Sequence, residues 1–245
     1  MTKNIDSWIK NRTEHQVKAL EKASKYFDNN DAFTINTLEA IYGQESSFGK
    51  YDKSEKRGDK GAVGHFQIER GTAEEYGLKI TKENDPRFDV NESSEIAAQY
   101  LIRLNSLFNS NRRLGEDKEG NIISTIFVPD INERKSFIIA AYNGGQGTIA
   151  KAQMAAKSDG KDATKWEIVK EYLEEAGATD AKAKEIIEYV EKVLAYEKEF
   201  AKKSKANKKL KDKEPSKVSD NNSEDGHWVT LDNGRHVFIE DKKVG

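Results

Sequence analysis

The sequence has no cysteine, and only three prolines and four histidines occur among its 245 residues. The absence of cysteine excludes disulfide bonds, thiolate metal sites and cysteine nucleophiles. Four histidines spread along the chain argue against a three-histidine metal centre. We therefore expect neither a metal ion nor an organic cofactor.

Long apolar runs and an excess of one charge are also missing. No stretch approaches the ~18–20 apolar residues that span a bilayer, and the first eight residues lack the apolar core of a secretory signal. Lys and Arg number 41 against 43 Asp and Glu, a formal net charge of −2. We expect no membrane span and no nucleic-acid partner, and synthesis in the cytoplasm without a signal peptide.

The composition is polar for a folded chain. Apolar residues make up 36%, charged residues 34%, and the mean hydropathy is −0.86. Three Trp, nine Tyr and ten Phe nevertheless argue against disorder throughout. We expect a compact core with solvated appendages.

The spacing of apolar residues predicts a mainly helical chain. Intervals of three and four indicate helices at about residues 5–28, 91–108, 133–143, 148–157, 164–176 and 180–203. Asn36 followed by Glu39 resembles a capping box that opens one more short helix. We divide the chain into an N-terminal helix (1–29), a helical domain (30–201), a charged linker (202–226) and a C-terminal β-hairpin (227–245).

Three segments differ from this helical pattern. In the glycine-punctuated segment at about 50–68, residues 62–68 are expected to be extended, as a small β element. The polar segment 109–132 is expected to hold a second hairpin. At the C-terminal end, two alternating apolar runs flank Asn233-Gly234, which predicts a hairpin with Val229 opposite Phe238.

Glu45 is the most informative residue for chemistry. The apolar stripe Leu38, Ile41, Tyr42 continues to Glu45 at the helical interval, where glycines and serines break the helix. Burial raises the pKa of a carboxyl group, which suits a general acid near neutral pH. The alternative is a solvated glutamate in a fraying last turn.

Two further clusters carry groups that suit a sugar ligand. The run 61–68 combines glycines, which allow close backbone approach, with the amide of Gln67. The run 140–145 ends an apolar helix with the phenol of Tyr142, the amide of Asn143 and two glycines. Each cluster alone is also compatible with an ordinary turn or core position.

Together these motifs resemble a known family. Glu45-Ser46-Ser47-Phe48-Gly49, then residues 61–68, then Ala141-Tyr142-Asn143-Gly144-Gly145 are similar to the three motifs of the soluble lytic transglycosylases. Tyr189-Val190 and the residues after it resemble the closing helix of that family. The resemblance covers roughly residues 30–200. It implies a goose-type-lysozyme-like α+β fold, with the small β element beside the cleft, and peptidoglycan as the substrate.

The resemblance also implies roles for single residues. Glu45 corresponds to the catalytic acid/base, and Ser46 to a serine that helps polarise the N-acetyl region of the substrate. Gln67 and Asn143 correspond to residues of the cleft. Tyr142 corresponds to a tyrosine hydrogen-bonded to the catalytic carboxyl group. His65-Phe66 departs from the family, where a Leu-Met pair is common.

The implied reaction is non-hydrolytic cleavage of the bond between N-acetylmuramic acid and N-acetylglucosamine, with a 1,6-anhydromuramoyl product. A hydrolase on the same fold is the first alternative. It needs a second carboxylate to activate water, for which Asp52, Asp59 and Glu69 are candidates. A non-catalytic glycan-binding or virion structural module is the second alternative.

The expected partners are peptidoglycan glycan strands and, through the C-terminal hairpin, virion or secretion-machine proteins. The hairpin residues resemble short tails of phage structural and processing proteins. We therefore expect action at the bacterial cell wall, as a phage virion or lysis component.

Overall fold

The computed structural model describes residues 2–28, 32–50, 61–211, 226–230 and 236–240. Residues 1–202 form one compact unit and residues 203–245 a second. Within the described residues, no helix is both long and apolar enough to cross a membrane.

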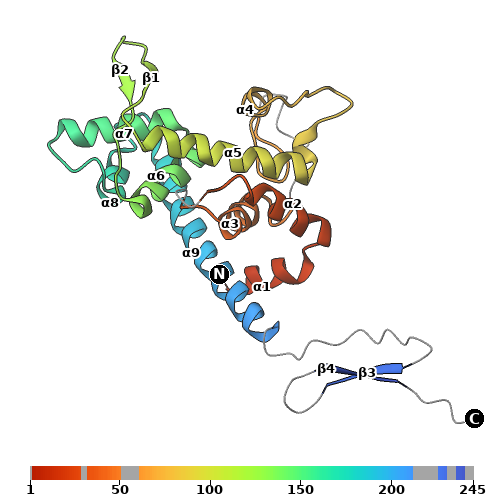
Figure 1. Ribbon diagram of the computed structural model, residues 1–245. Coiled ribbons are helices and arrows are strands. Elements are labelled where there is room, and N and C mark those ends of the chain that lie inside the picture. Colours follow the sequence, from red (N-terminus) through yellow and green to blue (C-terminus); the bar gives the residue numbers. More distant parts are fainter. Residues whose placement is uncertain (1, 29–31, 51–60, 212–225, 231–235, 241–245) are drawn as a thin grey trace, which may run out of the picture. The chain divides into compact units, whose positions relative to one another are not determined.

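The first unit is mainly helical, as expected (Figure 1). Its longer helices are α1 (Thr2–Asn11), α2 (Glu14–Ser24), α3 (Ile35–Ser46), α5 (Val90–Phe108), α6 (Ile131–Gly144), α7 (Gln146–Ser158) and α9 (Asp180–Lys211). Short helical turns are α4 (Arg70–Glu75), η1 (Pro86–Phe88), α8 (Trp166–Val169) and η2 (Lys170–Tyr172). The strands are β1 (Arg113–Glu116) and β2 (Ile122–Ser124).

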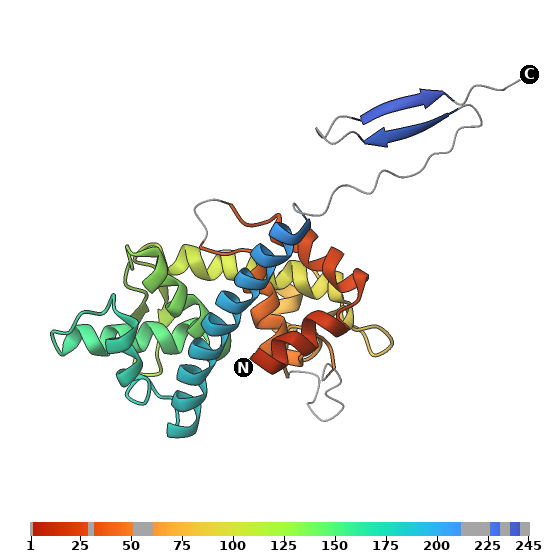
Figure 2. The same cartoon turned by 90° about the horizontal axis from the view of Figure 1, so that it is seen from below.

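Helix α5 lies at the centre of this unit, with α2 and α6 packed against it. Its inward face is the predicted apolar stripe, and Ile96, Leu101, Leu104 and Phe108 are all buried. Helix α9 runs across the bundle (Figure 2), and its Ile186, Val190, Val193 and Phe200 join the same core. One continuous apolar core therefore connects the two ends of the unit.

The N-terminal segment 1–29 is two helices, so the prediction of a single helix was wrong. Helix α1 ends at Asn11, and Thr13 opens α2 through a capping box. The Thr13 amide donates to Gln16 Oε1 at 2.8 Å, and the Gln16 amide donates to Thr13 Oγ1 at 3.2 Å. The apolar spacing continues through this break, which is why periodicity alone missed it.

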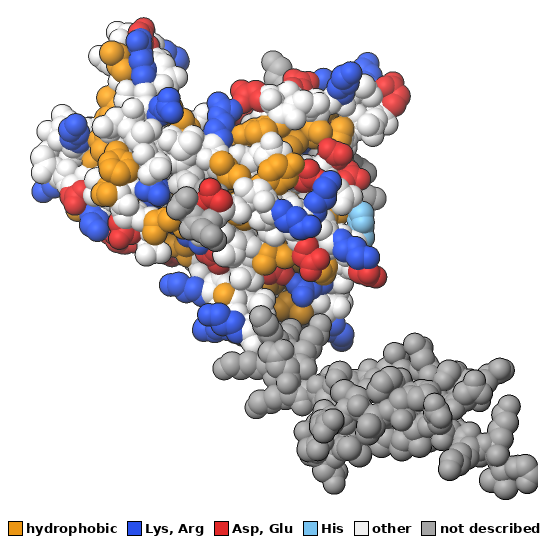
Figure 3. Space-filling model, in the orientation of Figure 1, with side chains coloured by type: hydrophobic (Ala, Val, Ile, Leu, Met, Phe, Trp, Pro, Cys, Tyr) orange, Lys and Arg blue, Asp and Glu red, His pale blue; other side chains and the backbone are white. Residues whose placement is uncertain are grey.

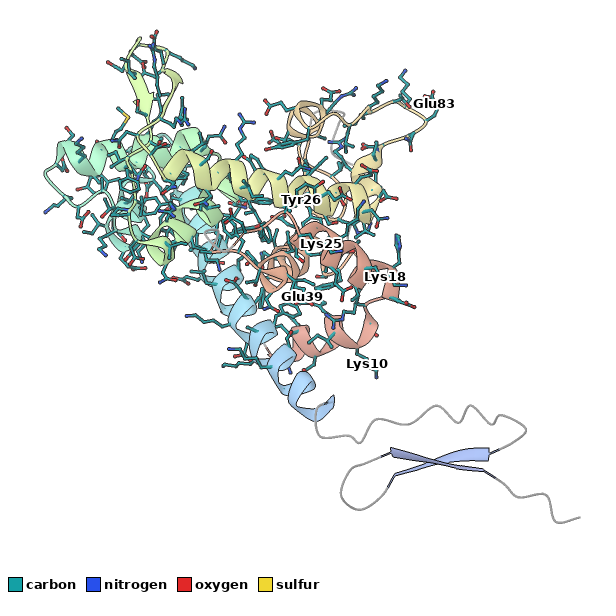
Figure 4. All side chains as sticks on the ribbon, in the orientation of Figure 1. Lys10, Lys18, Lys25, Tyr26, Glu39 and Glu83 are labelled. Carbon is teal, nitrogen blue, oxygen red and sulfur yellow. The ribbon has the colours of Figure 1, made fainter. Side chains whose placement is uncertain are left out.

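The start of α3 also differs from the prediction. Thr34, not Asn36, is the N-cap, and its Oγ1 accepts from the Asn36 amide at 3.2 Å. Glu39 is 4% exposed and forms an ion pair with Arg12, from the turn between α1 and α2. Figure 4 labels Glu39 on α3, inside the unit. Burial raises the pKa of Glu39, and the Arg12 charge opposes that rise.

The β structure matches the prediction in part. Segment 109–132 contains the expected hairpin, β1 paired antiparallel with β2. The glycine-rich segment is no strand over its described residues 61–68, but a tight turn closed by one bridge between Val63 and Ile68. Its two glycines and its backbone at positive φ favour a turn over an extended strand.

In the second unit, β3 (Gly226–Thr230) pairs antiparallel with β4 (His236–Glu240). Trp228 lies opposite Phe238, and Thr230 lies opposite His236. The expected register, with Val229 opposite Phe238, was therefore wrong by one residue. Hairpins with longer connections than two residues are common, so an Asn-Gly pair does not fix the register alone.

Trp8 fastens α1 to the rest of the first unit. Its ring stacks on Phe48 and Phe200 at centroid distances of 5.8 and 6.4 Å, and it meets Tyr196 edge-on at 5.1 Å. On α3 the ring lies directly over Gly43, where an added Cβ would come within 2.5 Å of it. The glycine inside α3 is thus required by the close approach of α1.

We expect Gly43→Ala to lower the free energy of unfolding by up to about 2 kcal/mol. The overpacking cost of about 1–3 kcal/mol exceeds the ~1 kcal/mol that alanine gains in a helix. Urea denaturation followed by circular dichroism measures the change. Gly71→Ala in α4 is the control, because no atom lies within 4 Å of its added Cβ. Equal stability of Gly43→Ala and the wild type would contradict this account.

Candidate active site

A cavity of about 730 Å³ lies where α3 ends. The turn 61–69, α4, α5, the α6–α7 junction and the start of α9 form its other walls. The lining residues are Glu45, Gly61, Ala62, Gln67, Ile68, Glu69, Thr72, Glu75, Tyr100, Arg103, Tyr142, Asn143, Gly144, Gly145, Gln146, Lys182 and Glu185. The structure thus brings together Glu45, Gln67, Tyr142 and Asn143, four of the five predicted site residues.

Glu45 lies in the last turn of α3, partly buried in the cavity wall. Residues 37–43 of α3 are all buried, so the helix has no single inward stripe, and Glu45 is buried only in part. The helix ends just beyond it because Ser47, Phe48 and Gly49 all have positive φ, at 52°, 60° and 81°. Residues other than glycine adopt a left-handed backbone conformation at a cost in energy, and here Ser47 and Phe48 both do so. Such backbone strain often accompanies a functional site.

Tyr189 of α9 holds the Glu45 carboxylate. Its hydroxyl donates to Glu45 Oε1 at 2.5 Å, across 144 residues of sequence. Tyr142 was expected to make this bond, but its hydroxyl donates to the carbonyl of Phe66 at 3.1 Å. Tyr142 lies beside Glu45 in the cavity wall and supports the glycine-rich turn instead.

Burial keeps both phenols protonated. Removal from water, and then the negative charge of Glu45, raise the pKa values of Tyr142 and Tyr189 well above that of a free tyrosine. The bond to Glu45 adds to the rise for Tyr189. Two neutral phenols therefore flank the carboxylate, and neither supplies a competing negative charge.

Gln67 reaches the cavity from a strained turn. Its backbone has φ +47°, and its side-chain Nε2 donates to the Gly64 carbonyl at 2.9 Å. Buried Arg87 fastens the turn by donating to the carbonyls of Gly61 and Ile68, at 3.0 and 3.2 Å. Gly64 is needed because an added Cβ would lie 1.9 Å from the Arg87 carbonyl oxygen.

Ser46 does not line the cavity, contrary to its predicted role at the substrate. It is 1% exposed, and its hydroxyl donates to the His65 carbonyl at 2.7 Å. The same oxygen accepts from the Gly49 amide at 3.0 Å. Ser46 therefore ties the end of α3 to the glycine-rich turn, so it positions the wall that carries Glu45 and Gln67.

Asn143 meets two charged side chains of α9 in the cavity wall. Lys182 Nζ donates to Asn143 Oδ1 at 3.1 Å, and Asn143 Nδ2 donates to Glu185 Oε1 at 3.1 Å. Lys182 and Glu185 also pair with each other at 2.9 Å. These bonds fix which end of the Asn143 amide faces which neighbour.

The sequence predicted no role in the cavity for Lys182, Glu185, Tyr189 and Tyr100, although it placed Tyr189 in a motif of the family. The first three recur at intervals of three and four on α9, so one helix face covers the cavity. The spacing is visible in the sequence, but only the packing of α9 against α3 shows that this face of the helix is turned toward the cavity. Tyr100 packs its ring 5.5 Å from that of Tyr142 and donates to Gln146 Oε1 at 3.2 Å.

Of the three candidate acids for a hydrolytic base, Glu69 lines the cavity. Asp52 and Asp59 lie outside the described residues. Among the residues that the structure describes, no group of three or more His, Asp or Glu side chains is arranged to hold a metal ion. The described cavity offers carboxyl groups, neutral amides, phenols and the two cationic side chains of Arg103 and Lys182.

Comparison with known proteins places this site in a family. Residues 22–165 match the Transglycosylase SLT domain. The chain is 27% identical over 173 residues to "Membrane-bound lytic murein transglycosylase F" of Desulfosudis oleivorans, covering 67% of this chain and 32% of that protein. It is 32% identical over 107 residues to "Membrane-bound lytic murein transglycosylase D" of Escherichia coli K12, covering 44% of this chain and 19% of that protein.

The chain thus spans a third or less of the length of these curated relatives. Both relatives come from bacteria, and nothing in the comparisons supports the expected phage origin. The matched region includes Glu45, the glycine-rich turn and Asn143, whereas α1 and α9 lie outside it.

The tyrosines that line the cavity predict that the protein loses stability at alkaline pH. Burial raises the pKa of Tyr100 to about 12. Between pH 10 and 12 the unfolded chain loses this proton and the folded chain keeps it, so stability falls as pH rises. We expect Tyr100→Phe to reduce the slope of unfolding free energy over this window by up to about 1.4 kcal/mol per pH unit. Urea denaturation at several pH values measures it, and an unchanged slope would contradict the prediction.

Proposed function

The chain belongs to the SLT transglycosylase family, which is a family of enzymes, and on this premise we propose that it is a peptidoglycan lytic transglycosylase. The proposed scissile bond is the β-1,4 bond between N-acetylmuramic acid and N-acetylglucosamine. The observation that carries the proposal is the placement of Glu45 in the cavity wall, fixed by the Tyr189 hydroxyl.

In the first step, the Glu45 carboxylic acid protonates the glycosidic oxygen as the bond to muramic acid C1 breaks. Positive charge develops on C1 and the ring oxygen, and the substrate's own N-acetyl group stabilises it. The leaving N-acetylglucosamine departs with the proton of Glu45. A partly buried carboxyl group is suited to hold that proton until the substrate arrives.

In the second step, the Glu45 carboxylate takes the proton of the muramoyl C6 hydroxyl. The C6 oxygen then bonds to C1 and closes the 1,6-anhydro ring. Glu45 regains its proton, so the cycle needs neither water nor a second carboxylate. The Tyr189 hydroxyl stabilises the carboxylate that exists between the steps, since hydrogen bonds to ionised groups are the strong ones.

The neutral amides have a binding role in this proposal. Gln67 and Asn143 are fixed by bonds to Gly64, Lys182 and Glu185, and each retains hydrogen-bonding capacity for sugar hydroxyl or N-acetyl groups. Groups that are held before the substrate binds cost less entropy on binding.

A hydrolase is the second candidate because Glu69 shares the cavity with Glu45. Glu69 would act as a base that activates water on the opposite face of the sugar. The transglycosylase is favoured because the family match and both named relatives support it. In either case the enzyme acts at the cell wall, and docking of the C-terminal hairpin on a virion or secretion machine remains a prediction from the sequence.

The wild type should release muropeptides with anhydromuramoyl ends from purified sacculi, as measured by mass spectrometry. Glu45→Gln keeps the shape but cannot donate the proton, so we expect release to fall by at least ~100-fold. Reducing ends from the wild type would establish hydrolysis and direct attention to Glu69. Equal release by both proteins would exclude Glu45 as the acid.

Tyr189→Phe should lower kcat by about 10- to 100-fold, with KM changed by less than about threefold. This is the effect of losing a hydrogen bond to a charged group, worth about 1.5–3 kcal/mol. Steady-state kinetics on soluble glycan fragments separates the two parameters. Tyr172→Phe is the matched control, since the Tyr172 hydroxyl bonds Asp159 away from the cavity. A fall of the same size in the control would refute the assignment.

A further inference from the structure

A second cavity, of about 630 Å³, lies between α1 and the turn that follows α3. Its lining residues are Asn4, Ser7, Trp8, Asn11, Ser47, Phe48, Gly49 and Lys50. The α1 residues of this lining lie outside the region that matches the family, and the residues of the turn lie inside it. It is nearly as large as the cavity that contains Glu45.

The walls of this second cavity are fixed in place. Helix α1 is held by fully buried Ile5 and by Trp8, which is packed between Phe48 and Phe200. The opposite wall is the turn with three residues at positive φ. Neither wall depends on the polar side chains that face the cavity, so the site exists before any ligand binds.

Those polar side chains form one row on α1. Asn4, Ser7 and Asn11 recur at intervals of three and four, and all three are exposed. Within the row, Asn11 Nδ2 donates to Ser7 Oγ at 3.2 Å. Two amides and a hydroxyl offer both donors and acceptors without charge, and Trp8 and Phe48 supply an apolar floor. Neutral hydrogen-bonding groups above an apolar floor match the chemistry of an N-acetylated sugar.

The charge of the second cavity differs from that of the first. The first is lined by four glutamates against one arginine and one lysine. The second is lined by one lysine, and no Asp or Glu occurs among its described lining residues. Among the described lining residues, the second cavity therefore repels the carboxylates of a glycan strand less than the first cavity does.

Contacts of α9 relate the second cavity to Glu45. Tyr189 contacts Glu45, whereas Tyr196 and Phe200 of the same helix contact Trp8. These positions are 7 and 11 residues apart on α9, about 10–16 Å along its axis at 1.5 Å per residue. An oligosaccharide of a few rings spans such a distance.

We propose that the second cavity is an accessory glycan-binding site for the N-acetylated sugar strand, separate from the catalytic cavity. It rests on the proposed function for the identity of the polymer. Its role is to retain the strand on the enzyme, which raises the effective concentration of scissile bonds at Glu45.

The test measures binding of the full chain to purified sacculi in a Glu45→Gln background, where no cleavage changes the ligand. Ser7→Trp fills the cavity, and an Asn4→Ala/Asn11→Ala double variant removes its amides. Each should weaken binding by about tenfold, equivalent to ~1.4 kcal/mol. Lys10→Trp is the matched control, because Lys10 is on α1 but points away from the unit (Figure 4). Circular dichroism and thermal denaturation verify that every variant is folded.

Unchanged binding in both cavity variants would overturn the proposal, as would an equal loss in the Lys10→Trp control. Weaker binding in both cavity variants, with the control unaffected, would support it. A soluble oligomer of N-acetylglucosamine should compete for the site, and failure to compete would point to a peptide ligand and overturn the sugar assignment. If the wild type binds sacculi through this cavity but releases no muropeptide, the proposed function fails while the binding site stands.

Discussion

The hydrogen bond between Tyr189 and Glu45 is the interaction on which the site depends. It joins the end of α3 to α9, two helices that lie 144 residues apart in sequence at this contact. The bond is short, and its acceptor oxygen lies in a partly buried wall. Without the packing of α9 across the bundle, Glu45 would be a glutamate at the exposed end of a helix.

The other walls serve to keep this carboxylate facing a cavity. Arg87 and Ser46 bind the glycine-rich turn from two sides, through backbone carbonyl groups. Tyr142 donates to the same turn, so the predicted cleft tyrosine stabilises the wall and the predicted substrate serine is structural. Each hydroxyl has one proton to donate, so a hydroxyl bonded to a backbone carbonyl does not also donate to Glu45. Tyr142 donates to the turn, and Tyr189 donates to Glu45 in its place.

The surface around these walls is highly charged, with both signs interspersed over the face shown in Figure 3. Many of the acidic and basic side chains pair at helical intervals of three or four, such as Lys192 with Glu188. Exposed pairs of this kind contribute little to stability. The pair of buried Glu39 with partly exposed Arg12 has a different role. It holds the break between α1 and α2 against α3, where a buried carboxylate without its partner would be costly.

Periodicity and motif order in the sequence determined the mainly helical class, the bounds of α5, α6 and α7 within a few residues, and four residues of the cavity wall. Local signals were sufficient there because the apolar face of one helix, or the residues of one turn, decide where these elements lie. They failed at Thr13, at Thr34 and in the C-terminal register, where several local alternatives have similar energies. Only the tertiary structure decided that Tyr189 reaches Glu45, that Ser46 is buried, and that α1 adds a second cavity, since these contacts join segments whose separation no local pattern encodes.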